Sequence, residues 1–132
     1  MLKKTVTYMD YNGVERTEDF YFNFSKAELL EMELSTVGGF SERVRKIIDA
    51  KDQPSLVKLI KDFVLDAYGE KSADGKRFMK NEEIRTAFVE NPAYSAIFME
   101  LAMNADEAAK FVNGVAPADM AKNIPAIDAV NQ

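Results

Sequence analysis

Polar and hydrophobic residues alternate over the first 24 positions, which is the pattern of strands with one buried face. Asn12-Gly13 interrupts the alternation, so we predict a β-hairpin over residues 4–24. A two-residue turn would set Val6 opposite Asp19, a poor pair, whereas a three-residue loop with left-handed Gly13 aligns the apolar side chains. We therefore predict the three-residue loop, with an apolar face formed by Val6, Tyr8, Phe20, Phe22 and Phe24. A lone hairpin is marginal in water, so this face must pack on helices.

Hydrophobic positions recur at helical spacing from residue 25 onward, and capping residues divide this part into short helices. The clearest helix has Pro54 at its first position and Gly69 just past its end. Residues 69–80 are expected to form a loop with a turn at Asp74-Gly75. Further helix starts are predicted at Ser25, Ser41, Asn81, Asn91 and Asn104, and helix ends at Gly38-Gly39 and Gly114.

The same spacing predicts which face of each helix is buried. The residues expected to face the core are Ala27, Leu30, Leu34, Val37, Val44, Ile47, Ile48, Leu56, Val57, Ile60, Phe63, Val64, Ala67, Tyr94, Phe98, Leu101, Ala102, Ala108, Phe111 and Val112. The predicted fold class is α+β, mostly α, with the hairpin packed on a bundle of about five to six short helices. Residues 1–114 are expected to form one globular domain, and residues 115–132 a loosely ordered C-terminal tail.

Composition narrows the chemistry that is open to this chain. It has 132 residues, a formal net charge of −5, and no Cys or His, so thiolate–metal sites, Cys–His dyads and Ser–His–Asp triads are excluded. The acidic balance argues against nucleic-acid and anionic-membrane partners. The sequence shows neither a membrane-spanning apolar run nor a secretory signal, so we expect a cytoplasmic protein. We also expect no cofactor.

Acidic and glycine motifs give no clear site. A calcium loop starting at Glu70 would lack the bidentate Glu at its twelfth position, so an ordinary loop is favoured and no metal site is expected. Gly38-Gly39 matches no phosphate-binding motif. We expect the carboxylate pairs to be solvated and not catalytic, and these pairs are Glu31 and Glu33, Asp62 and Asp66, and Glu82 and Glu83. We expect the basic groups to lie on solvent-exposed faces, and these groups are Arg43-Arg45-Lys46 and Lys76-Arg77-Lys80. We therefore predict no catalytic residue.

Methionine is the least ordinary feature, with seven in the chain. Several apolar residues lie off the predicted core faces, and they are the candidate partner-binding residues: Met32, Leu65, Met99 and Met103. Methionine is flexible and polarizable, and it is frequent at adaptable binding surfaces. The alternative is that a second layer, such as the hairpin or the C-terminal tail, covers these residues.

Three stretches carry a resemblance to a known family: Phe22-Asn23-Phe24-Ser25-Lys26-Ala27-Glu28-Leu29, Ala67-Tyr68-Gly69-Glu70-Lys71-Ser72-Ala73-Asp74-Gly75-Lys76-Arg77-Phe78, and Phe111-Val112-Asn113-Gly114. Over about residues 4–117 the chain resembles the short tail assembly chaperones of long-tailed (siphovirus-type) phages and prophages of Gram-positive bacteria. The resemblance implies a non-enzymatic protein that binds the tape-measure protein, keeps it soluble and promotes tail-tube assembly around it. It also implies absence from the finished virion, and it assigns no active-site residue.

The residues, together with this resemblance, leave three functions open. The first is a helical binding module whose Met-bearing faces hold an apolar helix or a second copy of the chain. The second is a structural tail completion or connector protein retained in the virion. The third is a small hydrolase, which would need two buried acids in a deep pocket.

Overall fold

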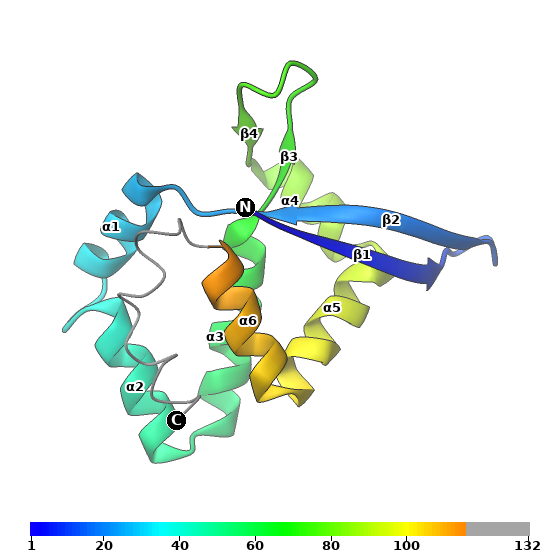
Figure 1. Ribbon diagram of the computed structural model, residues 1–132. Helices are drawn as coiled ribbons and strands as arrows, with labels where there is room; N and C mark the ends of the chain where they lie inside the picture. The colour runs from blue at the N-terminus through cyan, green and yellow to red at the C-terminus, as the bar shows by residue number, and fades with distance from the viewer. Residues whose placement is uncertain (116–132) are drawn as a thin grey trace.

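The computed structural model describes residues 1–115, apart from the side chains of Ser41 and Ile48, and shows an antiparallel sheet packed against helices (Figure 1). The fold is α+β and mostly α, as predicted. Its elements are β1 (Leu2–Met9), β2 (Glu15–Phe22), α1 (Lys26–Ser35), α2 (Phe40–Ala50), α3 (Gln53–Ala67), β3 (Tyr68–Lys71), β4 (Phe78–Met79), α4 (Glu82–Val89), α5 (Pro92–Met103) and α6 (Ala105–Val115).

The first hairpin has the predicted register. Val6 pairs with Glu18, and the loop of three residues ends at Gly13, which has a φ of +78°. The Asp10 carboxylate accepts hydrogen bonds from the backbone N–H groups of Asn12 at 2.8 Å and Val14 at 2.9 Å. A local side-chain cap and a left-handed glycine therefore fix the turn, and the turn fixes the face that each strand buries.

A second hairpin replaces the predicted loop over residues 69–80. Strands β3 and β4 extend the sheet in the order β1-β2-β3-β4, and the expected turn at Asp74-Gly75 joins them, with Gly75 at a φ of +75°. Gly69 lies just past the end of α3, as predicted, but it belongs to β3 and is buried against Phe78. Strands of four and two residues are too short to show an alternating pattern in the sequence.

Most predicted helix starts are confirmed by their caps. The side-chain oxygens of Asn81, Asn91 and Asn104 accept hydrogen bonds from backbone N–H groups of the first turns of α4, α5 and α6. Helix α2 begins at Phe40, one residue before the predicted cap. The predicted end of α6 at Gly114 is wrong, since the helix continues to the buried Val115. The tail predicted from residue 115 otherwise lies outside the described residues.

Ser25 and Glu28 form the predicted capping box of α1. The Glu28 N–H donates to Ser25 Oγ at 3.1 Å, and the Ser25 N–H donates to Glu28 Oε1 at 2.9 Å. Ser25→Ala is expected to lower the free energy of unfolding by about 1 kcal/mol, because an N–H loses its acceptor. Urea unfolding followed by circular dichroism measures this change. Ser95→Ala, an exposed site inside α5, is the matched control and should not destabilise the protein.

The main core lies between the hairpin face and helices α3 to α6. Phe22 is fully buried, and its ring centroid lies 5.7 Å from that of Tyr68, 5.8 Å from Phe88 and 5.0 Å from Phe111. Tyr68 stacks on Phe88 at 3.9 Å, and burial raises the pKa of Tyr68 to about 12. This aromatic layer holds the hairpin on the helices, as the sequence predicted.

Two helices bury different faces from those predicted. Leu30 and Leu34 on α1, and Val37 just past its end, were expected in the core, but they are 56%, 76% and 99% exposed. Instead, the opposite side of α1 packs on the main core through Leu29 and Met32. On α5, Leu101 is buried as predicted, but the other buried residues are Ala93 and Ile97, and the predicted Tyr94 and Phe98 are only half-buried. Both helices carry apolar residues on more than one side, so periodicity alone does not select the buried face.

Candidate functional site

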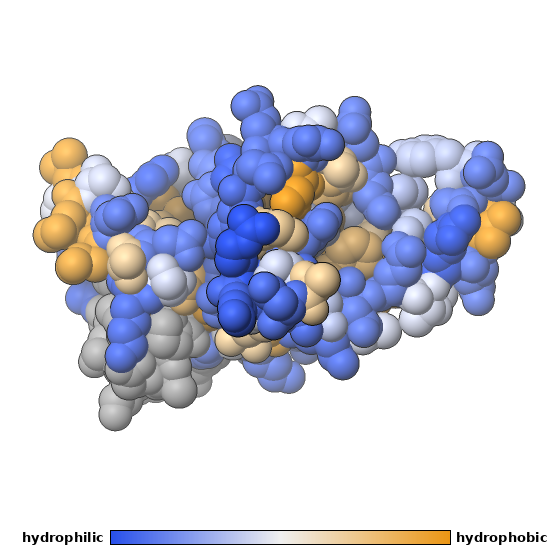
Figure 2. All heavy atoms as spheres, turned by 90° about the horizontal axis from the view of Figure 1, so that it is seen from above, coloured by the Kyte–Doolittle hydropathy of each residue, from blue (hydrophilic) through white to orange (hydrophobic). Residues whose placement is uncertain are grey.

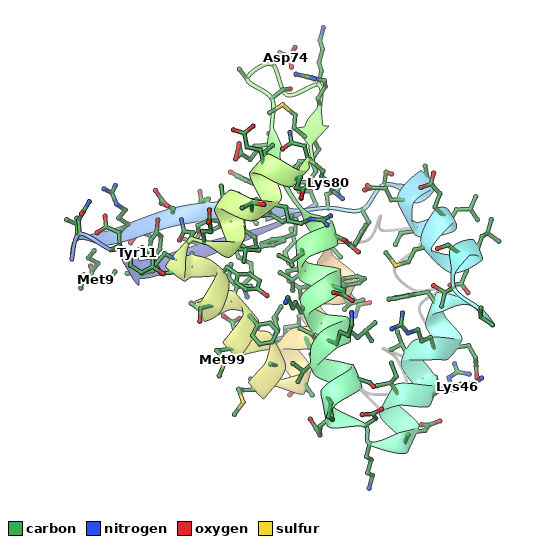
Figure 3. All side chains as sticks on the ribbon, turned by 180° about the vertical axis from the view of Figure 1, so that it is seen from behind. Met9, Tyr11, Lys46, Asp74, Lys80 and Met99 are labelled. Atoms are coloured by element: carbon green, nitrogen blue, oxygen red, sulfur yellow. The ribbon has the colours of Figure 1, made fainter. Side chains whose placement is uncertain are left out.

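An apolar groove of about 490 Å³ lies along α3. Helices α2 and α5 lie on opposite sides of α3 (Figures 1 and 3), and α6 completes the wall on the side of α5. Helix α3 supplies Leu56, Leu59, Ile60, Phe63 and Val64, helix α2 supplies Phe40, Val44 and Ile47, and the α5–α6 wall supplies Leu101, Ala102, Met103, Ala105, Ala108, Ala109, Phe111 and Val112.

The groove exists because two hydrophobic clusters meet only in part. Val44 and Leu59 form a small cluster with neighbouring side chains of α2 and α3, separate from the main core. Phe40 packs against both clusters, and its ring stacks on Phe63 at 6.0 Å. The facing wall on α6 includes the small residues Ala105 and Ala108 beside Phe111 and Val112, and the alanines leave space where larger side chains would have closed the core.

Charge is confined to one end of the groove, at the α2–α3 connection. Lys51, Asp52 and Gln53 line this end. The Ser55 hydroxyl donates to Asp52 at 2.6 Å and the Ser55 N–H donates at 3.3 Å, and these bonds lower the pKa of Asp52. The carboxylate is therefore tied to the helix cap. The groove is therefore apolar along its length and polar at one end, and a groove of this kind suits an amphipathic helix.

The structure brings one of the four candidate partner-binding residues to the groove. Met103 lines it and is 77% exposed, and Met99 lies one turn earlier on α5 and points outward (Figure 3). The expectation that Met32 and Leu65 lie outside the core is wrong, because both are half-buried against the main core. Sequence periodicity placed Leu56, Ala108 and Val112 in the core, and it missed that they border an open groove.

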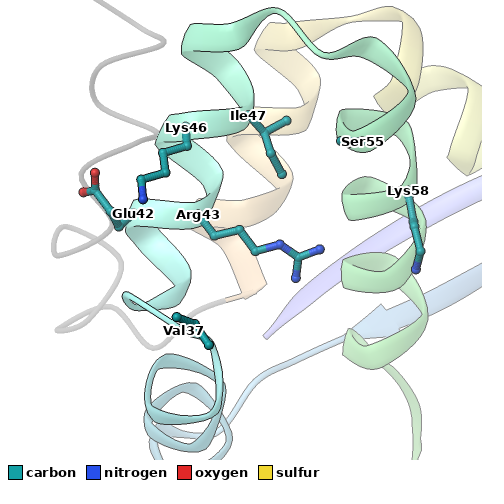
Figure 4. Close-up of a pocket in the computed structure, with 7 residues that line it drawn as sticks. All are labelled: Val37, Glu42, Arg43, Lys46, Ile47, Ser55 and Lys58. Atoms are coloured by element: carbon teal, nitrogen blue, oxygen red, sulfur yellow. The ribbon is translucent and has the colours of Figure 1, made fainter.

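A second apolar surface lies on α1 and the segment just after it. Leu30, Leu34 and Val37 are all exposed, and Figure 2 shows hydrophobic residues gathered at the α1 end of the molecule. Val37 also borders a smaller, open pocket of about 310 Å³ between α2 and α3, with Arg43, Lys46 and Lys58 around it (Figure 4). The exposed Lys58 pairs with Asp62 at 2.9 Å. This pocket is basic and solvated, whereas the groove is larger and apolar.

Acid–base chemistry finds no support in the described part of the chain. Among residues 1–115 with described side chains, no polar or charged residue is buried, and no cluster of acidic residues suited to a metal ion occurs. Asp62 and Asp66, one of the carboxylate pairs, each face a cation: Lys58 at 2.9 Å and Arg85 at 3.1 Å. Partial burial raises the pKa of Asp66. These carboxylates form surface ion pairs and are not enclosed in a deep pocket.

Comparison with known proteins agrees with a surface built for protein binding. A family model described as phage tail assembly chaperone matches residues 1–130. The chain belongs to this family. No curated protein and no solved structure matches the chain significantly. Membership gives this tail assembly chaperone a role in building phage tails through binding to tail proteins, and it points to a non-enzymatic activity. No helix of this chaperone within residues 1–115 has the length and hydrophobicity needed to cross a bilayer.

Proposed function

We propose that this tail assembly chaperone binds the tape-measure protein of a siphovirus-type phage or prophage of Gram-positive bacteria, and holds a helix of it in the groove along α3. The partner stays soluble in the host cytoplasm until tail-tube subunits assemble around it, and the chaperone does not remain in the virion. The observation that carries the proposal is the groove itself, which presents large apolar side chains of α2 and α3 on one side, and on the other a wall where Ala105 and Ala108 stand beside Phe111 and Val112.

The dimensions of a helix support this use of the groove. An α-helix is about 10 Å across with its side chains, and its backbone comes closer to a neighbour where that neighbour carries only small residues. Ala105 and Ala108 are such small positions within the α6 wall, and Leu56 and Ile60 on α3 add larger apolar surface to the groove. Met103 at the rim has the flexibility to fit partner side chains of different shapes. The groove therefore favours a class of amphipathic helices over one sequence.

Repeated weak binding suits a long helical partner. Each groove covers a short segment, so many copies of the chaperone would cover a long chain. A partner with several such segments gains avidity from multivalent binding without a tight individual site. When one copy of the chaperone dissociates, the other copies stay bound, so tail-tube subunits can displace the chaperone stepwise.

Ala108→Arg is expected to weaken this activity strongly. The guanidinium group would enter the apolar groove without a partner, and we expect binding of the tape-measure protein to weaken by about tenfold or more, which corresponds to about 1.4 kcal/mol. The measurement is the soluble fraction of tape-measure protein on co-expression with the chaperone. Ala87→Arg, an exposed site on α4, adds the same charge away from the groove and should behave like the wild type.

Two outcomes would contradict the proposal. If Ala108→Arg keeps its circular dichroism spectrum and still maintains the soluble tape-measure protein, the groove is not the binding site. If mass spectrometry of purified virions detects the chain in stoichiometric amounts, the protein is a structural tail component, the alternative function.

A further inference from the structure

We propose that the outer edge of β1 pairs with the same edge of a second copy of this chain, so that two sheets join into one. The proposal stands on an open strand edge of eight residues, and on a lysine at one end of the hairpin that matches a glutamate at the other end. This edge is separate from the groove along α3, so the inference does not rest on the proposed function.

The outer edge of β1 is unpaired along its length. β1 is the first strand in the order β1-β2-β3-β4, and Figure 1 shows it at the margin of the sheet. The Asp10 N–H donates to the Val14 carbonyl at 2.9 Å, and the direction of main-chain groups alternates from residue to residue along a strand. The residues whose N–H and C=O groups therefore point outward are Lys3, Thr5, Thr7 and Met9. Within residues 1–115 no main-chain hydrogen bond reaches these groups.

The strand lacks the features that usually keep an edge from pairing. It contains no proline, and its register with β2 runs without a bulge from Leu2 to Met9. Its middle, Thr5-Val6-Thr7-Tyr8, carries no charge and consists of residues that favour strands. A long, regular edge of this kind is a template for another strand.

One antiparallel register pairs all four outward-pointing residues with one another. It sets Thr5 opposite Thr7 of the second copy, Lys3 opposite Met9, and Val6 opposite itself on the two-fold axis. Each outward-pointing pair exchanges two main-chain hydrogen bonds. A shift of two residues in either direction would leave an outward-pointing residue opposite a position beyond the end of the strand. Because both copies use the same residues, the contact closes as a dimer.

Charge complementarity favours this arrangement. Lys3 is exposed, and so is Glu15, which pairs with Met9 across the hairpin, and neither forms an ion pair with another of the described residues. In the dimer, Lys3 would lie two strands from Glu15 of the second copy, about 10 Å between backbones. The lysine side chain can cross Met9 and reach that carboxylate. Parallel pairing would instead set the lysines of the two copies side by side, which is unfavourable.

Sedimentation equilibrium of the full chain is expected to show a concentration-dependent dimer, and Thr7→Pro should abolish it. Proline removes an outward-pointing N–H and fills the edge, whereas the bonds between β1 and β2 remain. Thr17→Pro is the matched control, because Thr17 lies opposite Thr7 on β2 and its N–H points to the other edge of the hairpin. This variant should dimerise like the wild type, and circular dichroism checks that both variants fold.

A cross-link tests the register. The chain has no cysteine, so Val6→Cys introduces a single thiol, and this thiol faces its counterpart across the two-fold axis. The two Cα atoms would be about 4.5 Å apart, within the range that a disulfide spans. Oxidised glutathione should therefore convert Val6→Cys to a covalent dimer. Thr17→Cys, one strand away in each copy, should remain uncross-linked.

Exchanging the charges tests the choice of a second copy. Lys3→Glu is expected to weaken dimerisation by about fivefold, because two lysine–glutamate pairs are lost in each dimer. Lys3→Glu combined with Glu15→Lys restores both pairs with the signs exchanged, and should recover the wild-type dimer. Failure of the double variant to recover it would contradict the register. If Thr7→Pro does not fold, this exchange and the cross-link decide the question.

Other outcomes overturn the inference. A wild-type chain that stays monomeric at every concentration does so, and so does a dimer that persists in folded Thr7→Pro or is lost in folded Thr17→Pro. If the wild type is monomeric and Thr7→Pro no longer keeps the tape-measure protein soluble, the edge binds a strand of that partner and not a second copy. Ala108→Arg leaves β1 unchanged and should dimerise normally, so failure of the groove and failure of the dimer are distinguishable.

Discussion

Phe22→Ala will lower the free energy of unfolding by about 3–5 kcal/mol, the range for an aromatic side chain removed from a core. Phe22 is fully buried, and its ring contacts Tyr68, Phe88 and Phe111 from three other elements. Because small domains have a total stability of about 5–15 kcal/mol, a large share of the protein is expected to be unfolded at 37 °C. Urea unfolding at 25 °C, followed by circular dichroism, measures the change.

Tyr21→Ala is the matched control for this prediction. Tyr21 is the preceding residue of β2 and points to the opposite face, where it is half-buried beneath Lys71, with the Lys71 Nζ 4.4 Å from the ring centroid. Its loss removes surface contacts and leaves the core filled, so the expected cost is about 1 kcal/mol. Similar costs for the two substitutions would mean that the alternation of β2 does not define the core.

Local chemistry explains what the sequence could predict. Caps such as Ser25 and Asn91 act on the first turn that follows them, and Gly13 acts within its own loop, so neighbours in sequence suffice to place these elements. The buried hairpin face follows from the same turn. These predictions needed no knowledge of the tertiary structure, and the structure confirms them.

The orientation of α1 and the existence of the groove depend on distant parts of the chain. The Lys80 Nζ donates to Glu28 at 2.7 Å and to the Asn23 carbonyl at 2.7 Å, and this contact ties the start of α1 to the segment before α4. Leu29 then faces the core and Leu34 faces solvent. The groove similarly requires α2 and α6 to lie apart, which depends on how each packs on α3. Periodicity within one helix contains neither piece of information.

Gly69→Ala will lower the free energy of unfolding by about 2–3 kcal/mol, because its new methyl group has no space. A Cβ at this position would lie 2.6 Å from Phe78 Cε2 and 2.8 Å from the Met79 carbonyl oxygen. The ring can rotate away, but the carbonyl belongs to the paired strand β4 and moves only if the strands separate. Thermal unfolding and amide hydrogen exchange of β3 measure the loss.

Gly75→Ala separates packing from backbone strain. Gly75 has open space around it but a φ of +75°, so alanine there should cost about 1 kcal/mol through conformation alone. If Gly69→Ala costs no more than Gly75→Ala, β4 moves aside freely and the close approach is not a constraint. The second hairpin also lies away from the groove residues of α2 and α6 (Figure 1). The folded fraction of Gly69→Ala should therefore still hold the proposed partner, and stability and binding would be separable in this protein.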